Sequence, residues 1–241
     1  MRAVVCGASG AMGRLICDLL GQQVVGRVSL DGGNQSVTDF AQLGDIQPDM
    51  VIDFSHHTAA QVVCDYALAK NCPLVIGTTG HTPEEKQRIQ NAAGQVPVFF
   101  SGNMSMGIAI LCKLARQTAA AFPEADVEIV EIHHNRKADA PSGTAKMLFE
   151  AVKEARPELT AHCGRAGEGK RTSGEVGISS LRMGNIVGIH EVHIATGNQT
   201  LTLRHEAHDR GMFAEGAMEA AAFLQGKAPG LYTMNDLLEA K

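Results

Sequence analysis

The sequence contains no tryptophan and few other aromatic residues, with two tyrosines and eight phenylalanines among its 241 residues. Platforms for single-stranded nucleic acid need aromatic side chains on which bases stack. The chain has 21 basic against 26 acidic residues, which gives a net charge of −5, so no global positive field attracts nucleic acid either. Nucleic acid is therefore not expected as a partner.

Long apolar runs and paired cysteines are also missing. No run approaches the roughly 18 residues that a membrane span requires, so no membrane partner is expected. The six cysteines are scattered with no CxxC pair, as is typical of free thiols in a reducing compartment. The chain begins directly with a strand pattern, which argues against a signal peptide. We therefore expect a cytoplasmic protein.

The first hundred residues alternate short apolar strands with helical patterns. Because the strands are apolar throughout and do not alternate with polar residues, they predict a parallel sheet that helices cover on both faces. This is an α/β fold of the Rossmann type, with a doubly wound parallel sheet. We expect strands at residues 3–5, 50–54, 74–77 and 96–100, helices at 12–20 and 59–67, and a capped helix starting at Thr82.

A different pattern begins near residue 103. A helix is expected at 108–121, a strand at 126–132, a helix from Ser142 to Ala151, and a loop at 164–177, which we expect to be mobile. Two strand patterns, HEVHIAT and QTLTLRHEA, flank Gly197-Asn198, a two-residue hairpin signal. We predict a second α+β domain whose open, mainly antiparallel sheet serves oligomerisation.

These patterns predict two domains. Residues 1–103 would form the dinucleotide-binding domain and residues 104–210 the substrate-binding and oligomerisation domain. The C-terminal segment 211–241, with a helix at 211–224, would return to the first domain.

Glycines dominate the turn between the first strand and the first helix, in GASGAMGR at residues 7–14. Backbone N–H groups at a helix N-terminus can approach a pyrophosphate only where side chains are small. Ser9 stands where the commoner fingerprint has its second glycine. The strand before the loop and the helix after it favour a dinucleotide site over a plain turn. The GTTG and SGNM loops, at 77–80 and 101–104, follow strand ends at the same sheet edge and outline one crevice with it.

Asp31 follows the next apolar run, 18 residues beyond Gly13. An acid near this position accepts hydrogen bonds from the adenosine ribose and repels a 2′-phosphate. A turn aspartate before Gly32-Gly33 explains it equally well. Since no arginine or lysine follows, the cofactor is NADH or NADPH, with a weak preference for NADH.

Ten histidines raise the question of a metal. HEVHI and HEAHD resemble the zinc-binding HExxH, but each spacing is one residue short. On a strand, residues i and i+3 point to opposite faces. We expect no metal site, and we expect His56 and His57 to cap a helix. No GxSxG elbow indicates a serine hydrolase either.

The segment EIHHNRKADAPSGTA at residues 131–145 gathers cationic side chains beside a helix start. These side chains could hold an anion, move a proton, bind a metal or face water. Together with GASGAMGR, GTTG, SGNMSMG and the C-terminal RHEAHDRGMFAEGAMEAAAFLQGKAPGLYTMNDLL, the segment resembles the 4-hydroxy-tetrahydrodipicolinate reductase (dihydrodipicolinate reductase) family. The resemblance runs over nearly the whole chain.

The resemblance implies nicotinamide-dependent reduction of a cyclic imine-type dicarboxylate on the route to diaminopimelate and lysine, by a homotetramer of two-domain subunits. It implies that His133 is catalytic, that Lys137 donates the proton, that His134 contacts substrate, and that Gly143 and Thr144 grip a substrate carboxylate. The positions that match the family's cofactor loops are Gly7, Ala8, Ser9, Gly10, Ala11, Met12, Gly77, Thr78, Thr79, Ser101, Gly102, Asn103 and Met104.

The chemistry of these residues agrees with the resemblance. A dicarboxylate needs cations and a helix N-terminus, and hydride arriving at a C=N carbon leaves a nitrogen that needs a proton. Three positions depart from the family pattern: Met104 replaces a common phenylalanine, Met183 a glycine, and Ala11 a basic residue. A related amino-acid dehydrogenase, for aspartate or homoserine, and a non-catalytic dinucleotide sensor are the alternatives. The retained His133 and Lys137 argue against the sensor.

Overall fold

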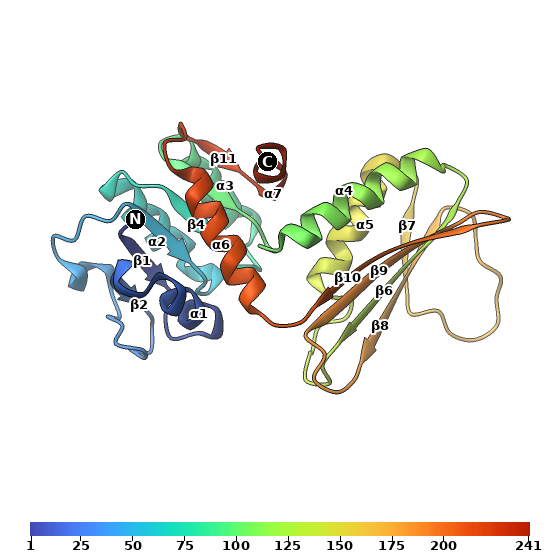
Figure 1. Ribbon diagram of the computed structural model, residues 1–241, viewed down its shortest axis with the longest axis horizontal. Coiled ribbons are helices and arrows are strands. Elements are labelled where there is room, and N and C mark those ends of the chain that lie inside the picture. The colour runs from blue at the N-terminus through green and yellow to red at the C-terminus, as the bar shows by residue number, and fades with distance from the viewer. The chain divides into compact units, whose positions relative to one another are not determined.

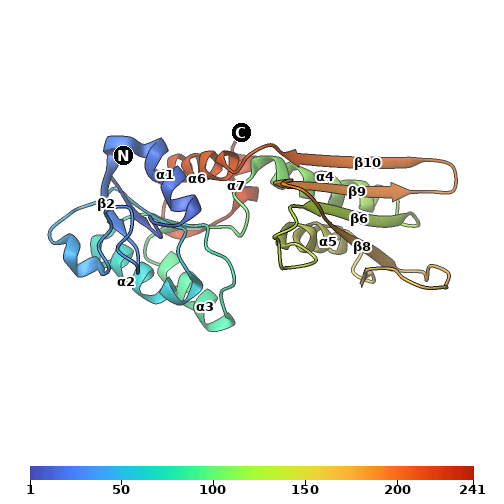
Figure 2. The same cartoon turned by 90° about the horizontal axis from the view of Figure 1, so that it is seen from below.

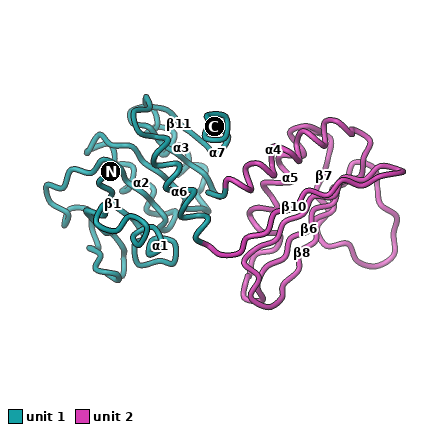
Figure 3. Tube along the Cα trace, viewed as in Figure 1, with its two compact units in different colours: residues 1–105, 211–241 teal, residues 106–210 magenta.

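The computed structural model describes all residues, 1–241, and they form two compact units (Figures 1 and 3). The first unit comprises residues 1–105 and 211–241, and the second comprises residues 106–210. The boundary was expected after residue 103, and the first unit extends two residues further, to Ser105. No helix combines the length and apolarity that crossing a bilayer requires.

The first unit is built on a six-stranded sheet in which every pairing is parallel. Its central strands are buried at every residue, as the unbroken apolar runs predict for a sheet covered on both faces. In spatial order the strands are β11 (Gly230–Tyr232), β5 (Pro97–Phe100), β4 (Leu74–Ile76), β3 (Met50–Asp53), β1 (Ala3–Cys6) and β2 (Val24–Val28).

Helices cover both faces of this sheet (Figure 2). Helix α1 (Ala11–Leu20) packs against α6 (Gly211–Leu224) on one face, and α2 (Ala60–Lys70) packs against α3 (Pro83–Ala93) on the other. The C-terminal segment adds α6, β11 and α7 (Met234–Glu239) to the first unit. The Rossmann-type prediction is therefore confirmed.

Short 3₁₀ turns and caps complete the first unit, with η1 at Gly21–Gln23, η2 at Phe40–Leu43 and η3 at His57–Ala59. The predicted capping box of α3 forms, since Thr82 and Glu85 each accept a hydrogen bond from the other's backbone N–H. His56 caps η3 by accepting from the Thr58 N–H, as expected.

The second unit has a five-stranded sheet, with helices α4 (Met106–Ala121) and α5 (Gly143–Ala155) packed together in its core. In spatial order the strands are β10 (Thr200–Ala207), β9 (Gly188–Ala195), β6 (Asp126–His133), β8 (Glu175–Arg182) and β7 (Thr160–Cys163). The hairpin of β9 and β10 forms, with Thr196 and Gln199 bonded across Gly197-Asn198.

The expected antiparallel pattern holds for β10, β9 and β6, whereas β8 and β7 join in parallel, so the sheet is mixed. The expected loop at 164–177 is shorter than predicted, because β8 begins at Glu175. Residues 175–178 of β8 are all buried, but only Val176 and Ile178 among them are large and apolar, so the strand signal in the sequence is weak.

Strand β6 connects this fold to the candidate site. Its residues alternate between buried and partly exposed, and the buried face carries Val127 and Ile129, followed by Glu131 and His133. A strand that continues its inward face with two titratable groups places them beneath the helices instead of in water.

Candidate functional site

The glycine loop leads from β1 into α1. Gly7 has a φ of +74° and donates its N–H to Val28 O on the adjacent strand, at 2.9 Å. A Cβ at this position would lie 2.3 Å from Phe54 O, so only glycine fits. The bare backbone therefore faces the edge at which the parallel strands end.

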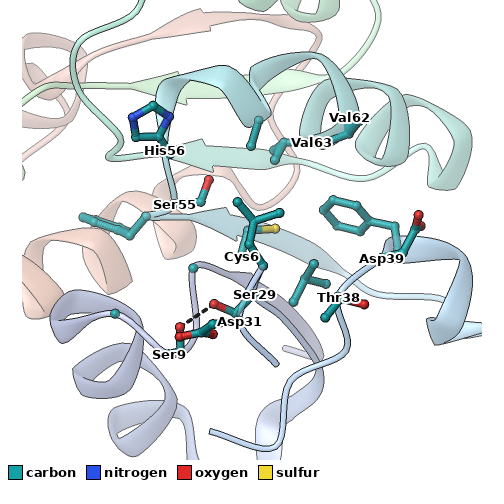
Figure 4. Close-up of a pocket in the computed structure, with 17 residues that line it drawn as sticks. Cys6, Ser9, Ser29, Asp31, Thr38, Asp39, Ser55, His56, Val62 and Val63 are labelled. Atoms are coloured by element: carbon teal, nitrogen blue, oxygen red, sulfur yellow. Dashed lines mark hydrogen bonds between the residues drawn. The ribbon is translucent and has the colours of Figure 1, made fainter. Parts of the chain in front are cut away.

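A cavity of about 530 Å³ opens beside this loop (Figure 4). Ser9, Ser29 and Asp31 gather on one wall, where the two serine hydroxyls are hydrogen-bonded to each other. No lysine or arginine is among the lining residues, which are Cys6, Gly7, Ser9, Gly10, Val28, Ser29, Leu30, Asp31, Thr38, Asp39, Phe40, Phe54, Ser55, His56, Ala59, Val62 and Val63. Bare glycine backbone, hydroxyls and an apolar wall fit a dinucleotide.

Asp31 is in a turn and also lines the cavity. Its carboxylate accepts the Gly33 N–H at 3.0 Å, as a turn aspartate does, and it lies on the cavity wall beside Ser9 and Ser29. Hydrogen bonds from the Gly33 N–H and from the Ser9 and Ser29 hydroxyls lower the pKa of Asp31, so it is an anion at neutral pH.

The other expected cofactor residues lie on neighbouring loops and do not line this cavity. The GTTG and SGNM loops touch, since a Cβ at Gly102 would lie 3.6 Å from Thr79 Cγ2. Thr78 donates to the buried carboxylate of Asp53 at the end of β3. Met104 is 1% exposed, and its backbone is in close contact with Gly216 of α6. Gly77, Ser101 and Asn103 belong to the same two loops, while Ala8, Ala11 and Met12 belong to the glycine loop and the start of α1.

The cationic segment of the second unit runs from the end of β6 to the start of α5. The Lys137 ammonium lies 2.6 Å from the Asp139 carboxylate and is partly exposed. Ser142 caps α5 and is buried, with its hydroxyl accepting from the Ala145 N–H. Gly143 and Thr144 follow as the first residues of the helix, the position at which N–H groups bind anions.

Glu131 lies beneath this segment with a fully buried side chain. Arg182 of β8 donates to both of its carboxylate oxygens, each at 2.8 Å, and the His133 Nδ1 lies 2.5 Å away. Burial alone would raise the pKa of Glu131, but hydrogen bonds from Arg182, Ser180, His133 and the Ser142 N–H lower it to about 2. The group is therefore a carboxylate at neutral pH.

His133 and His190 form a buried pair. Their ring centroids are 5.1 Å apart with planes inclined at 72°, and His190 Nε2 lies 3.1 Å from the Ser142 hydroxyl. Burial lowers the pKa of His133 despite its bond to Glu131, and burial with the neighbouring His133 lowers the pKa of His190 to about 3. Both imidazoles are therefore neutral at neutral pH.

His134 takes a different environment from His133. Its backbone N–H donates to Ile186 O at 2.7 Å, and its ring is partly exposed with an Nδ1 that has no hydrogen-bond partner. Burial, together with the nearby Arg136 and Arg210, lowers the pKa of His134. Arg136 donates to the Asn185 side chain at 2.8 Å.

The two histidines within HEVHI, and the two within HEAHD, do not come together, although His190 and His205 pair across β9 and β10. His190 is buried whereas His193 lies on the opposite face of β9, and His205 belongs to β10 whereas His208 lies beyond its end. No group of three or more histidine, cysteine or acidic side chains has an arrangement that could hold a metal.

The sequence did not single out Glu131, Arg182 and His190 as members of this site. Glu131 could have been found from its spacing, because a residue two positions before His133 on a strand shares its face. The other two depend on contacts across about 50 positions of sequence, which no local pattern reveals.

Comparison with known proteins identifies the family of the chain. The dihydrodipicolinate reductase N-terminus family matches residues 1–104, and the dihydrodipicolinate reductase C-terminus family matches residues 107–238. The chain belongs to the dihydrodipicolinate reductase family. This family membership makes it an oxidoreductase that uses a nicotinamide cofactor.

Its relatives in the dihydrodipicolinate reductase family match along their whole length. The 4-hydroxy-tetrahydrodipicolinate reductase of Alkaliphilus oremlandii is 42% identical over 240 residues, covering 99% of this chain and 98% of that protein. The enzyme of the same name from Akkermansia muciniphila is 42% identical over 243 residues, covering 98% and 96%.

Solved structures agree on the fold. Dipicolinate-bound dihydrodipicolinate reductase from Paenisporosarcina sp. TG-14 matches with a TM-score of 0.78 and 24% identity, covering 98% of each chain. Aspartate dehydrogenase from Thermotoga maritima matches with a TM-score of 0.51 and 12% identity, covering 95% of this chain and 98% of that chain. The shared architecture therefore extends to dehydrogenases outside the dihydrodipicolinate reductase family.

Proposed function

We propose that this chain reduces 4-hydroxy-tetrahydrodipicolinate to tetrahydrodipicolinate with a nicotinamide cofactor, in the biosynthesis of diaminopimelate and lysine. The observation that carries the proposal is the segment from His133 to Thr144. In a member of this family, it bonds an imidazole and a helix N-terminus to one buried carboxylate, and it carries the Lys137 ammonium on the loop between them. A cyclic imine with two carboxylates needs these three kinds of group.

The first unit holds the cofactor in this proposal. Gly7 to Met12 would receive the pyrophosphate, Asp31 the ribose hydroxyls, and the GTTG and SGNM loops the nicotinamide end, which supplies a hydride when bound. We infer a preference for NADH over NADPH. Its support is the Asp31 anion in the cavity wall and the absence of lysine and arginine from that lining.

The second unit binds and protonates the substrate. The N–H groups at Gly143 and Thr144 and the His134 ring would hold a carboxylate, and Lys137 Nζ would give a proton to the ring nitrogen. Because the pKa of His133 is lowered, its neutral imidazole would act as a hydrogen-bonding partner of the substrate and as the second carrier of the proton.

We also propose a homotetramer located in the cytoplasm. The second sheet supports the assembly. Helices α4 and α5 both pack on the face of the sheet that carries the core, so they leave the opposite face uncovered. Leu181 on β8 lies on this opposite face and is exposed. Leu181 pairs with Ile132, a partly exposed residue of β6. An uncovered sheet face with apolar side chains is suited to pairing with a second copy.

Oxidation of NADH and NADPH, followed by absorbance, tests the function. The substrate is generated in place from pyruvate and aspartate semialdehyde by its synthase. Wild type should oxidise the cofactor, and Lys137→Ala should lose at least about 10²-fold in turnover, the scale of a missing general acid. NADH affinity, measured by its fluorescence on binding, should stay within about twofold. Lys153→Ala, in the last turn of α5, is the matched control and should retain turnover.

The alternatives give different results in the same assay. Oxidation of aspartate or homoserine with NAD, together with no reaction of the cyclic substrate, would move the protein to the amino-acid dehydrogenases. Tight NADH binding without turnover of any of these compounds would make it a sensor. The reductase is favoured, because relatives matched over their whole length bear that name and the amino-acid dehydrogenase likeness is limited to the fold.

A further inference from the structure

The Glu131 carboxylate divides its two oxygens between two parts of the site. Oε2 accepts from His133 Nδ1 and from Arg182 Nη1, while Oε1 accepts from Arg182 Nη2 at 2.8 Å and from the Ser142 N–H at 3.1 Å. Each oxygen therefore has one bond to the guanidinium and one bond to a group of the substrate-binding segment. Ser180 on the neighbouring strand β8 also bonds to this carboxylate. A carboxylate accepts about four hydrogen bonds, so both oxygens are fully engaged.

This arrangement determines which nitrogen of His133 carries the proton. A carboxylate without a proton can only accept, so the neutral imidazole must be protonated on Nδ1. Its Nε2 is then left with a lone pair and lies beside Gly188, the one residue whose missing side chain leaves room there. A histidine whose Nδ1 is held in this way has its Nε2 available for substrate.

The same carboxylate fixes the start of α5. Ser142 donates its N–H to Glu131, and its hydroxyl accepts from Ala145 while lying 3.1 Å from His190 Nε2. The next two residues, Gly143 and Thr144, are those proposed to hold a substrate carboxylate. Their position therefore depends on the bond between Ser142 and Glu131.

We infer that Glu131 is a positioning residue that sets the tautomer of His133 and the place of the α5 N-terminus together. This inference rests on the proposed function for the meaning of those two groups. Arg182 makes it possible, since its guanidinium neutralises the buried carboxylate and also donates to Asp139 O at 2.6 Å. The charged and titratable groups around the pair are Arg182 on β8, His190 on β9, His205 on β10, and Lys137 and Asp139 on the loop before α5.

The test uses Glu131→Gln in the full chain. An amide keeps the size of the side chain but can also donate a hydrogen bond to Nδ1, so the tautomer of His133 is no longer fixed. Nuclear magnetic resonance of ¹⁵N-labelled histidine reads the tautomer directly, and a His133→Asn variant assigns the signal. We expect wild type to show the Nδ1–H form and Glu131→Gln to show a mixture or the Nε2–H form. The His133 imidazole of Glu131→Gln should also titrate at lower pH than in wild type, because the carboxylate that stabilises the imidazolium is gone.

Kinetics provide the second measurement. We expect kcat to fall about 10²-fold and the KM for the dicarboxylate to rise, while NADH affinity stays within about twofold. Glu128→Gln is the matched control, since Glu128 lies on the opposite face of β6 and pairs with Arg171. It should leave the tautomer and kcat unchanged.

Two outcomes would overturn the inference. One is a Glu131→Gln protein that keeps the Nδ1–H tautomer, and the other is one that keeps wild-type kcat. If Glu131→Gln does not fold, Glu131→Gln with Arg182→Leu removes both buried charges together and takes its place. Wild-type kcat in that double variant overturns the inference, and a reduced kcat with the altered tautomer supports it. If wild type itself turns over no substrate, the proposed function fails, and the resonance measurement still decides whether Glu131 sets the tautomer.

Discussion

The Thr78 hydroxyl donates a 2.7 Å hydrogen bond to the carboxylate of Asp53, and both side chains are buried. The same hydroxyl oxygen accepts the Ser55 N–H at 2.9 Å. Burial raises the pKa of Asp53, and the bonds from Ser55 and Thr78 act in the opposite direction. Thr78 therefore connects the ends of β3 and β4 at the edge where the cofactor is proposed to bind.

Replacement of this hydroxyl should weaken the first unit. Thr78→Val keeps the shape but leaves a buried carboxylate short of a donor, so we expect the free energy of unfolding to fall by about 1.5–3 kcal/mol. Both tyrosines, Tyr66 and Tyr232, lie in the first unit, and tryptophan is absent. Urea unfolding followed by tyrosine fluorescence therefore reports on this unit alone. The neighbouring exposed Thr79→Val is the control, and equal midpoints for the two variants would contradict the prediction.

The second unit should lose stability in acid through His190. Burial lowers the folded-state pKa of this imidazole to about 3, below its ordinary value of 6.5. Because the folded protein favours the neutral form, the stabilisation is complete above about pH 6.5 and is lost as the pH falls toward about 3. The free energy of unfolding should decrease by up to about 1.4 kcal/mol per pH unit in that range.

Urea unfolding at a series of pH values measures this slope. Far-UV circular dichroism follows both units, and tyrosine fluorescence identifies the transition that belongs to the first unit, so the remaining transition belongs to the second. His190→Gln removes the titration and retains a group that can bond to the Ser142 hydroxyl. The free energy of unfolding of His190→Gln should depend less steeply on pH than that of wild type, by the equivalent of about one bound proton. Identical slopes would show that His190 is protonated as easily in the folded chain as in the unfolded one.

The fold of the first unit was predictable because its signals are local. Unbroken apolar strands, the glycine loop and the Thr82 capping box each depend on a few adjacent residues.

Two strands could not be predicted from local sequence. Strand β7 has no buried residue, and β11 has only three residues, so neither gives a hydrophobic pattern that differs from the residues around it. Their pairing depends on the strands beside them instead of on their own sequence.

The candidate site divides in the same way. His133, Lys137 and the Ser142 helix start lie within ten positions of one another, so the sequence could bring them forward together as a candidate site, and their roles stay predictions. The salt bridge from Arg182 to Glu131 joins residues 51 positions apart, and the contact from His190 to Ser142 joins residues 48 apart. Sheet pairing of β6 with β8 and β9 brings them together, and that register cannot be read from one strand.

Removal of the charge on Asp31 should change the cofactor preference. Asp31→Asn keeps an oxygen for the Gly33 N–H, so the turn is retained, but it loses the repulsion of a 2′-phosphate. We expect the ratio of kcat/KM for NADPH to that for NADH to rise by roughly tenfold, the scale of one charge–charge repulsion removed at the protein surface. Asp39→Asn is the matched control, because Asp39 lines the same cavity and caps η2. An unchanged ratio in Asp31→Asn would show that Asp31 stabilises the turn and does not select the cofactor.

A side chain at Gly188 should obstruct His133 Nε2, the nitrogen that we propose faces the substrate. An added Cβ would lie 3.1 Å from His133 Nε2, which is tighter than ordinary contact. The ring cannot move aside freely, since its Nδ1 is bonded to the buried Glu131. Gly188→Ala should therefore lower kcat by about tenfold with the substrate, because small displacements of a reacting group cost this much or more. NADH affinity should not change, since the glycine loop belongs to the other unit.

The control for this substitution is Gly169→Ala, in a loop where an added Cβ meets no atom within 4 Å. Thermal unfolding of both variants separates obstruction from loss of stability. If Gly188→Ala keeps its melting temperature and loses kcat, the methyl group acts on His133. If its kcat equals that of Gly169→Ala, His133 Nε2 does not face the substrate. Lys137 would then have to supply the proton without help from His133.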